Sequence, residues 1–385
     1  MNAAPGKVSS ASGFHAARVR GRSPRALSAS DAGQRYRSGP NMLSLTVTTP
    51  ESPIRPSGGQ TSVMISSIFR FGASAMERGS HVHHGVTILI PGNLLEGRYR
   101  VKRKFGNGGE GDIFIAQDEQ HHREVVIKAQ FPRSFESTSA YLSAGLPLRN
   151  ELERLSFMSH LPGIPKVLGD GYYGRNSGRY IAMDLIEGVT IRDWIAAHHP
   201  VPAITAASAI AQLCTILEGV HREKYVHRDV CPKNAMLRTD GRAYLLDVGI
   251  SGRAGKVNSD LRGTPPYAPP EQYDSQALMS PQVDVFSLGV MIFAMTSSEL
   301  PYCHIEGPPD TTDAPFRNGL PPGASRDLLS LGLSMVAVDP RDRPNGVAEV
   351  LRALEKMLPK LGSSASPKAA RPDPTTPYRL GAALL

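Results

Sequence analysis

The order in which apolar patterns follow one another along the chain constrains its fold more than any other feature. From Leu95 to residue 184, short apolar runs such as Val125–Ile127, with glycines between several of them, predict short strands and turns. From Leu185 onward, apolar residues recur at helical spacing, as in the stripe that runs from Ala206 to Leu213. Strands first and helices afterwards predict an α+β fold with a smaller β-rich lobe and a larger α-helical lobe.

Both ends of the chain differ in composition from this middle part. Residues 1–94 and 359–385 are rich in Ser, Gly, Pro and Ala, which predicts disordered segments. Residues 1–95 carry 10 Lys/Arg against 3 Asp/Glu, whereas residues 96–358 carry 29 basic and 31 acidic side chains. The basic excess belongs to the ends, so we expect no nucleic-acid-binding face on the folded part. The Arg-rich, acid-poor N-terminal region is also typical of a targeting or secretion segment.

The cysteines and the apolar runs indicate in which cellular compartment the protein acts and whether it spans a membrane. Cys214, Cys231 and Cys303 include no C-x-x-C pair, so neither a disulfide framework nor a zinc knuckle is predicted. The richest apolar run, Phe286–Met295, is shorter than the ~20 residues that a membrane-spanning helix needs. We therefore expect a soluble, cytoplasmic protein without a membrane span.

A glycine-rich stretch is the first candidate for a binding site. Residues 106–111, Gly-Asn-Gly-Gly-Glu-Gly, fit the pattern G-x-G-x-x-G, in which backbone N–H groups can approach phosphate oxygens because no Cβ is in the way. A flexible hairpin turn would show the same glycines. A dinucleotide-binding turn requires a helix next, whereas residues 112–116 have the pattern of a strand. The stretch therefore indicates a lid over a nucleotide.

A series of motifs further along makes the chain resemble the protein kinase family. Val125–Lys128 stands where the family has V-A-I-K, His227–Asn234 matches H-R-D-x-x-x-x-N, and Asp247–Gly249 stands where the family has D-F-G. Tyr267–Glu271, Asp284–Gly289 and Arg341–Pro344 follow in the family's order. The resemblance covers residues 95–358 and implies a bilobal protein-kinase-like fold, with a β-rich N-lobe (95–184) and an α-helical C-lobe (185–358). The compact lobes look like those of bacterial members of the eukaryotic-like (Hanks-type) serine/threonine kinases.

The resemblance implies a role for each motif residue. Asp229 would accept the proton of the attacking hydroxyl, and Lys128 would hold the α- and β-phosphates of ATP. Lys128 would in turn be held by Glu151, with Glu153 as the alternative. Two residues apart on a helix lie about 200° apart, so only one of the two glutamates can face Lys128.

The resemblance also implies the metal ligands and the nucleotide pocket. Asn234 and Asp247 would coordinate Mg²⁺. Adenine would lie between Ile113 and Val126 on one side and Met236 on the other, with residues 184–186 as the hinge. The complete set of cofactor-binding residues implied in this way is Gly106, Gly108, Gly111, Ile113, Val126, Lys128, Glu151, Met183, Asp184, Ile186, Met236 and Asp247.

Several positions depart from the family pattern. Cys231 stands where serine/threonine kinases usually have a lysine, and we expect Lys233, two residues later, to reach the same phosphate as a catalytic residue. We expect Cys231 to be a small buried side chain that fills space in the core. The alternative is that Cys231 acts as a nucleophile. Val248 replaces the usual Phe, and Glu110 places an acid in the glycine loop. These departures leave open a pseudokinase, a nucleotide-binding scaffold with weak or no turnover.

The resemblance thus implies an enzyme, a protein kinase that uses ATP and Mg²⁺ and acts on protein substrates. The form of residues 263–267, Gly-Thr-Pro-Pro-Tyr, favours Ser/Thr over Tyr specificity. Arg228 is a cation with which a phosphate on the activation segment could pair, and the candidate acceptors are Ser251, Ser259 and Thr264. Thr264 is expected instead to hydrogen-bond Asp229. A small-molecule phosphotransferase is the third hypothesis, and it is disfavoured because such enzymes generally lack the segment 267–271.

Overall fold

The computed structural model describes residues 89–107, 111–130, 138–174, 178–322 and 325–382. All of them belong to one compact unit, Ser62–Leu385. Gly108, Glu110 and nearly all of the N-terminal region 1–94 lie outside the described residues. The predictions made for them stay predictions.

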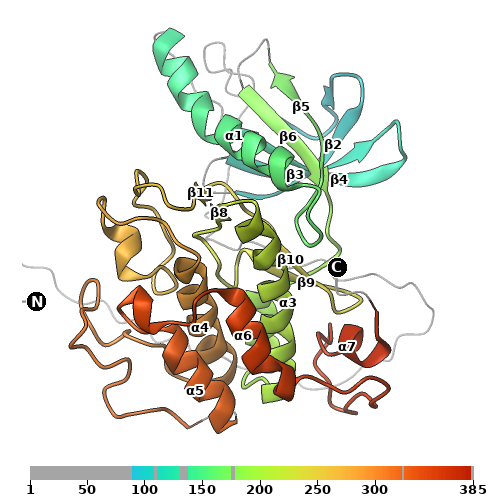
Figure 1. Ribbon diagram of the computed structural model, residues 1–385. Helices are drawn as coiled ribbons and strands as arrows, with labels where there is room; N and C mark the ends of the chain where they lie inside the picture. Colours follow the sequence, from blue (N-terminus) through green and yellow to red (C-terminus); the bar gives the residue numbers. More distant parts are fainter. Residues whose placement is uncertain (1–88, 108–110, 131–137, 175–177, 323–324, 383–385) are drawn as a thin grey trace, which may run out of the picture. The chain divides into compact units, whose positions relative to one another are not determined.

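The N-terminal part of the described chain forms a six-stranded antiparallel sheet (Figure 1). Its strands in spatial order are β1 (Leu94–Leu95), β2 (Tyr99–Asn107), β3 (Gly111–Asp118), β4 (Arg123–Gln130), β6 (Gly178–Asp184) and β5 (Val167–Tyr173). Helix α1 (Thr138–Met158) packs against β5 and β6. Six antiparallel strands, with one packed helix between β4 and β5, bear out the β-rich first part that the sequence pattern predicts.

Strand β4 separates the core of this sheet from a cavity. Successive side chains of a strand point to opposite faces. Val125 and Ile127 therefore pack in the sheet core, while Val126 and Lys128 line a cavity on the other face. Because Ile113 of β3 is paired with Lys128, it lines the same cavity.

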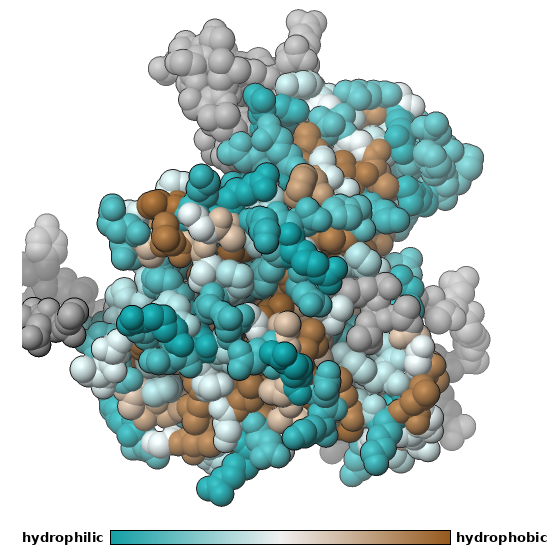
Figure 2. Space-filling view, in the orientation of Figure 1, coloured by the Kyte–Doolittle hydropathy of each residue, from teal (hydrophilic) through white to brown (hydrophobic). Residues whose placement is uncertain are grey.

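The outward-facing residues of β2–β4 are charged. Arg100 pairs with Glu119 at 2.6 Å and Lys102 pairs with Glu124 at 3.0 Å, and all four side chains are exposed. This end of the sheet is accordingly hydrophilic in Figure 2. Exposed pairs of this kind contribute at most about 1 kcal/mol, so the sheet depends on its apolar core.

Helices dominate the C-terminal part, as the stripes in the sequence predict (Figure 1). They are α2 (Ile191–His198), α3 (Ala203–Arg222), α4 (Gln282–Thr296), α5 (Arg326–Met335), α6 (Val347–Leu354), α7 (Thr376–Leu380) and the short 3-10 helices η1 (Pro270–Tyr273), η2 (Pro340–Asp342) and η3 (Glu355–Met357). Short strands accompany them, in one sheet with the order β10 (Ala243–Leu245), β9 (Ala235–Arg238), β7 (Gly188–Thr190) and in a pair of β11 (Gly252–Arg253) with β8 (Tyr225–Val226).

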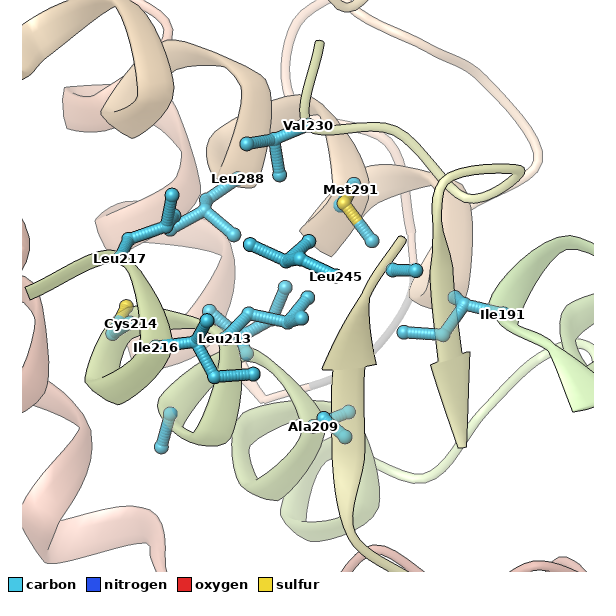
Figure 3. Close-up of a cluster of buried hydrophobic side chains, with 14 of the residues drawn as sticks. Ile191, Ala209, Leu213, Cys214, Ile216, Leu217, Val230, Leu245, Leu288 and Met291 are labelled. Atoms are coloured by element: carbon cyan, nitrogen blue, oxygen red, sulfur yellow. The ribbon is translucent and has the colours of Figure 1, made fainter. Parts of the chain in front are cut away.

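Helices α3 and α4 are buried along most of their lengths and form the centre of this part. Leu213 and Leu217 of α3 and Leu288 and Met291 of α4 gather around Leu245 of β10 (Figure 3). By length and composition alone, α3 could cross a membrane, which the search for apolar runs did not anticipate because polar residues interrupt it. Of its most apolar stretch, 72% is buried inside the protein, as in the core helix of a soluble domain.

Arg343 ties the end of the segment 267–271 to the helical core. Its guanidinium pairs with both carboxylate oxygens of Glu271, at 2.6 and 3.0 Å. It also donates to the carbonyls of Ala337, Gln282 and Val338. The Arg343 side chain is 0% exposed, so its charge depends wholly on these partners.

The chain beyond residue 358 is ordered, and the prediction of a disordered tail is wrong for residues 359–382. Trp194 Nε1 donates to the carbonyl of Pro372 at 2.9 Å, and Gln212 Nε2 donates to that of Pro374 at 3.0 Å. Asp373 is buried and pairs with Arg379 at 2.9 Å. Composition missed this packing because polar groups of α2 and α3 hold the segment through its backbone carbonyls. Residues 383–385 lie outside the described chain.

Replacing Arg343 by Ala is expected to lower the free energy of unfolding by about 3 to 5 kcal/mol, because Glu271 and three carbonyls lose their partner. Arg341→Ala, two residues earlier, removes an arginine whose side chain is 88% exposed and should leave stability unchanged. Urea denaturation followed by the fluorescence of Trp194, the single Trp of the chain, measures both. Equal midpoints for the two variants would contradict the role of Arg343.

Gln212→Ala tests the ordered C-terminal segment. Gln212 is fully buried, donates to Gly241 and Pro374, and accepts from the N–H of Ala243. Its removal leaves three backbone groups unpaired, which should cost about 2 to 4 kcal/mol. Gln276→Ala, at an exposed position, is the control. A protease should also cut residues 359–382 faster in Gln212→Ala, and an unchanged cleavage rate would argue against the docking.

Candidate active site

A cavity of about 1090 Å³, partly open to solvent, lies between the sheet and the strands of the helical part. Strands β3, β4 and β6 line one side, the link from Asp184 to Gly188 lines the rear, and Met236 of β9 lines the other side. Eleven predicted site residues line it: Ile113, Val126, Lys128, Glu151, Met183, Asp184, Ile186, Lys233, Asn234, Met236 and Asp247.

Lys128 and Glu151 form a buried ion pair in this cavity. Lys128 Nζ lies 2.6 Å from Glu151 Oε2, and the two side chains are 7% and 1% exposed. Glu153 faces solvent and pairs with Arg149 instead. The structure thus confirms the pairing of Lys128 with Glu151 and shows that the alternative, Glu153, was wrong.

Asp247 is the second carboxylate beside Lys128, with its Oδ2 at 3.6 Å from Nζ. Burial alone would raise the pKa of Asp247, but the Lys128 ammonium and the Gly249 N–H, 2.8 Å from Oδ1, outweigh it and lower the pKa. The carboxylate is therefore ionised at neutral pH, which is the form that a metal ion binds.

Three residues converge on the Asp229 side chain. Asn234 Nδ2 donates to Oδ2 at 2.7 Å and to the Asp229 carbonyl at 3.0 Å. Thr264 Oγ1 donates to Oδ1 at 2.5 Å, which confirms the bond expected for Thr264. Lys233 Nζ lies 3.9 Å from Oδ2. The carboxylate is thus held in one orientation by groups from its own loop and from the segment 263–267.

Asp284 of α4 fixes the backbone of this loop from below. Its carboxylate accepts from the N–H groups of His227 and Arg228 and from the His221 ring, each at 2.8 Å. Burial opposes the ionisation of Asp284, but the His221 hydrogen bond and nearby cations outweigh it and lower the pKa. Arg228 has a φ of 71°, a strained value for a non-glycine residue, and these bonds hold it there.

The predicted metal ligands have the chemistry that Mg²⁺ requires. Asn234 donates to Asp229 through Nδ2, so its Oδ1 is the atom that a metal ion would use. Asp247 supplies an ionised carboxylate. Among the described residues no cluster of three or more His, Cys, Asp or Glu side chains could hold a metal ion. Two protein oxygen ligands suffice for Mg²⁺ when phosphate oxygens and water complete its shell.

Cys231 and Val248, the two departures within the described chain, are both buried. The Cys231 thiol lies 3.8 Å from Asp229 Oδ1. Burial, helped by Asp229, raises the pKa of Cys231 to about 12, so the group remains a thiol. The high pKa supports the interpretation of Cys231 as a small buried side chain that fills space, and not as a nucleophile. Val248 is fully buried in the main core cluster together with Leu155 of α1.

Two of the predicted glycines do not line the cavity. Gly106 and Gly111 lie in β2 and β3 on either side of residues 108–110, which the structure does not describe. A Cβ on Gly111 would lie 2.0 Å from the carbonyl oxygen of Ala129, so glycine is required there by the approach of β3 to β4. The need for glycine at this position is thus structural in origin, whatever binds nearby.

The cavity also contains residues that sequence reasoning missed. They are Phe105, Pro165, Glu187, Gly188 and Leu246, whereas Leu185 lies in the predicted hinge. Phe105 directly precedes the glycine stretch and Leu246 directly precedes Asp247, so adjacency was a usable signal for these two. Pro165 reaches the cavity only through the tertiary structure.

Arg228 already has partners within the chain. Its Nη1 donates to the carbonyl of Ile250 at 3.1 Å, and its Nη2 donates to Asn258 Oδ1 at 2.8 Å and to the carbonyl of Asp260. Ser251, one predicted phosphate acceptor, is buried, whereas Ser259 is exposed. Of the three candidate acceptors, Ser259 is thus the accessible one.

Thiol titration tests the state of Cys231. Of the three cysteines, Cys214 and Cys231 are buried and Cys303 is exposed. At pH 8 the native protein should show one fast thiol toward Ellman's reagent, and three after unfolding, because a Cys231 pKa of about 12 leaves almost no thiolate. Cys303→Ser should remove the fast phase. A fast thiol that survives in Cys303→Ser would identify Cys231 as a reactive group.

Comparison with known proteins agrees with this geometry. Residues 99–354 match the family model described as protein kinase domain. Serine/threonine-protein kinase PknB of Mycobacterium tuberculosis is 28% identical over 277 residues, which cover 66% of this chain and 42% of that protein. PrkC of Bacillus subtilis is 25% identical over 218 residues, covering 56% of this chain and 32% of that protein.

A third relative, the serine/threonine-protein kinase pkn2 of Myxococcus xanthus, is 29% identical over 290 residues, covering 69% of this chain and 33% of that protein. The chain thus spans about two fifths of PknB and about a third of PrkC and pkn2. The family match, in contrast, extends over well more than half of this chain and includes every residue of the cavity. The chain therefore belongs to the protein kinase family.

Proposed function

We propose that this chain is a serine/threonine protein kinase that transfers the γ-phosphate of ATP to hydroxyl groups of protein substrates in the presence of Mg²⁺. One observation carries the proposal. Lys128 contacts both Glu151 and Asp247, while Asn234, Thr264 and Lys233 converge on Asp229. The names of the relatives support the Ser/Thr class.

The cavity supplies the groups that bind and orient ATP. Ile113 and Val126 form the apolar wall on one side, and Met236 and Leu246 are available for the other face of adenine. Lys128, fixed by Glu151, would hold the α- and β-phosphates. Lys233 lines the cavity and would hold a further phosphate, which makes up for the lysine that Cys231 replaces.

The charged groups would then act on the reaction itself. Phosphoryl transfer spreads charge over the phosphoryl oxygens, so catalysis relies on positioning and on electrostatic stabilisation. Mg²⁺ held by Asn234 and Asp247 would neutralise part of that charge. Asp229 would orient the attacking hydroxyl and accept its proton, and Thr264 and Asn234 keep its carboxylate aimed.

The place of action in the cell is part of the proposal. All three cysteines are free, which fits the reducing cytoplasm that the sequence pattern favours.

Asp229→Asn tests the proposed chemistry. The change keeps the size of the side chain but replaces one acceptor oxygen by an NH2 group and removes the base, and it should lower phosphate transfer from labelled ATP to a generic protein substrate by about 100-fold or more. Asp310→Asn, the same change in an exposed loop, is the control and should retain full transfer. ATP should still raise the melting temperature of Asp229→Asn.

The outcomes separate the hypotheses. Equal labelling by wild type and Asp229→Asn would overturn the proposal. Stabilisation by ATP without transfer by the wild type, with any metal, would identify a nucleotide-binding pseudokinase instead.

A further inference from the structure

The turn that follows Asp247 is held by two arginines from different parts of the chain. The carbonyl of Gly249 accepts a hydrogen bond from Arg154 Nη1, and the carbonyl of Ile250 accepts one from Arg228 Nη1 at 3.1 Å. Local bonds also shape the turn, from the Gly249 N–H to Asp247 and from the Ser251 N–H to the Val248 carbonyl at 3.0 Å. The two arginines are thus the charged donors to this backbone.

Arg154 belongs to the same helix as Glu151. The two residues are three apart in α1, a spacing that places their side chains on neighbouring faces of one helix turn. Glu151 forms an ion pair with Lys128, and Arg154 donates a hydrogen bond to the turn after Asp247. One turn of α1 therefore contacts Lys128, which would meet the nucleotide phosphates, and the turn that follows Asp247, which would bind the metal ion.

The turn has few other anchors to the N-terminal part. Gly249 has no side chain, and Val248, although fully buried, is short. Asp247 contacts Lys128 at 3.6 Å, too long for a hydrogen bond, so this contact restrains its position only loosely. A hydrogen bond from a guanidinium is stronger and more directional than a contact of that length.

A third arginine contacts the end of α1 from the segment that follows this turn. Arg253 of β11 lies over the ring of Phe157, at the end of α1, and over the ring of Tyr225 in β8, with its Cζ 5.6 and 4.4 Å from the centroids. The rings of Phe157 and Tyr225 also contact each other, with centroids 5.5 Å apart and planes tilted by 50°. Arg253 thus holds the end of α1 near the segment, but six residues beyond Asp247, so Arg154 is the more direct link.

We propose that Arg154 is a positioning residue, which keeps Asp247 in register with the Lys128–Glu151 pair by holding the Gly249 carbonyl. The effect on catalysis rests on the proposed kinase function, whereas the effect on the backbone does not. Loss of the Arg154 donor frees the turn, and Asp247 then samples orientations in which it does not face Lys128.

Arg154→Met keeps an unbranched, mostly apolar stem, although a shorter one, and removes the donor. It should lower kcat by about tenfold or more and raise the Mg²⁺ concentration needed for half-maximal activity, with little change in KM for the protein substrate. Arg154→Lys keeps a charged donor and should restore part of kcat and part of the response to low Mg²⁺ concentrations. Arg149→Met, on the same helix and facing solvent, is the matched control and should behave as wild type.

Hydrogen exchange measured by mass spectrometry reads the backbone without any turnover. Peptides that cover residues 247–253 should exchange faster in Arg154→Met than in wild type or Arg149→Met, with equal melting temperatures. Unchanged exchange and unchanged kcat in Arg154→Met would overturn the inference. Faster exchange in a protein whose wild type transfers no phosphate would uphold the link and overturn the proposed function. Normal phosphate transfer together with normal exchange in Arg154→Met would overturn the link and uphold the proposed function.

Discussion

The ion pair between Lys128 and Glu151 is the constraint on which the rest of the site depends. A buried charge is costly unless a partner of opposite charge lies within reach, so the ammonium fixes the carboxylate and the carboxylate fixes the ammonium. Because one residue belongs to β4 and the other to α1, the pair also sets how the helix lies on the sheet. Asp247, the third charge, brings the helical part into the same arrangement.

The same rule recurs around each reactive group: it is held by a residue that is distant in the sequence. Asp229 is aimed by Thr264, and the backbone of its loop is held by Asp284 of α4. Glu271, next to this region, is fixed by Arg343. The site therefore requires the whole helical core to be folded, although its motifs are short.

Local apolar patterns predicted the fold class, because strand and helix periodicity are properties of neighbouring residues. Most of the cavity residues were implied by the resemblance to the kinase family. Helix geometry predicted that only one of Glu151 and Glu153 could face Lys128, and the structure shows that it is Glu151. Residues 359–382 were misjudged because Trp194 and Gln212, which hold them, lie more than 150 residues away. The partners of Arg228 were not predicted either, because backbone carbonyls are present at every residue and no sequence pattern indicates which of them a side chain will contact.

The bonds of Arg228 have a consequence for how the segment after Asp247 responds to modification. A phosphate added there would have to break the contacts with Asn258 and Asp260 before it gained the guanidinium. It would exchange bonds to neutral oxygens for bonds to an anion, so only the difference between the two sets of bonds is left to drive a switch. The segment is thus held in one arrangement by bonds within the chain, before any modification takes place.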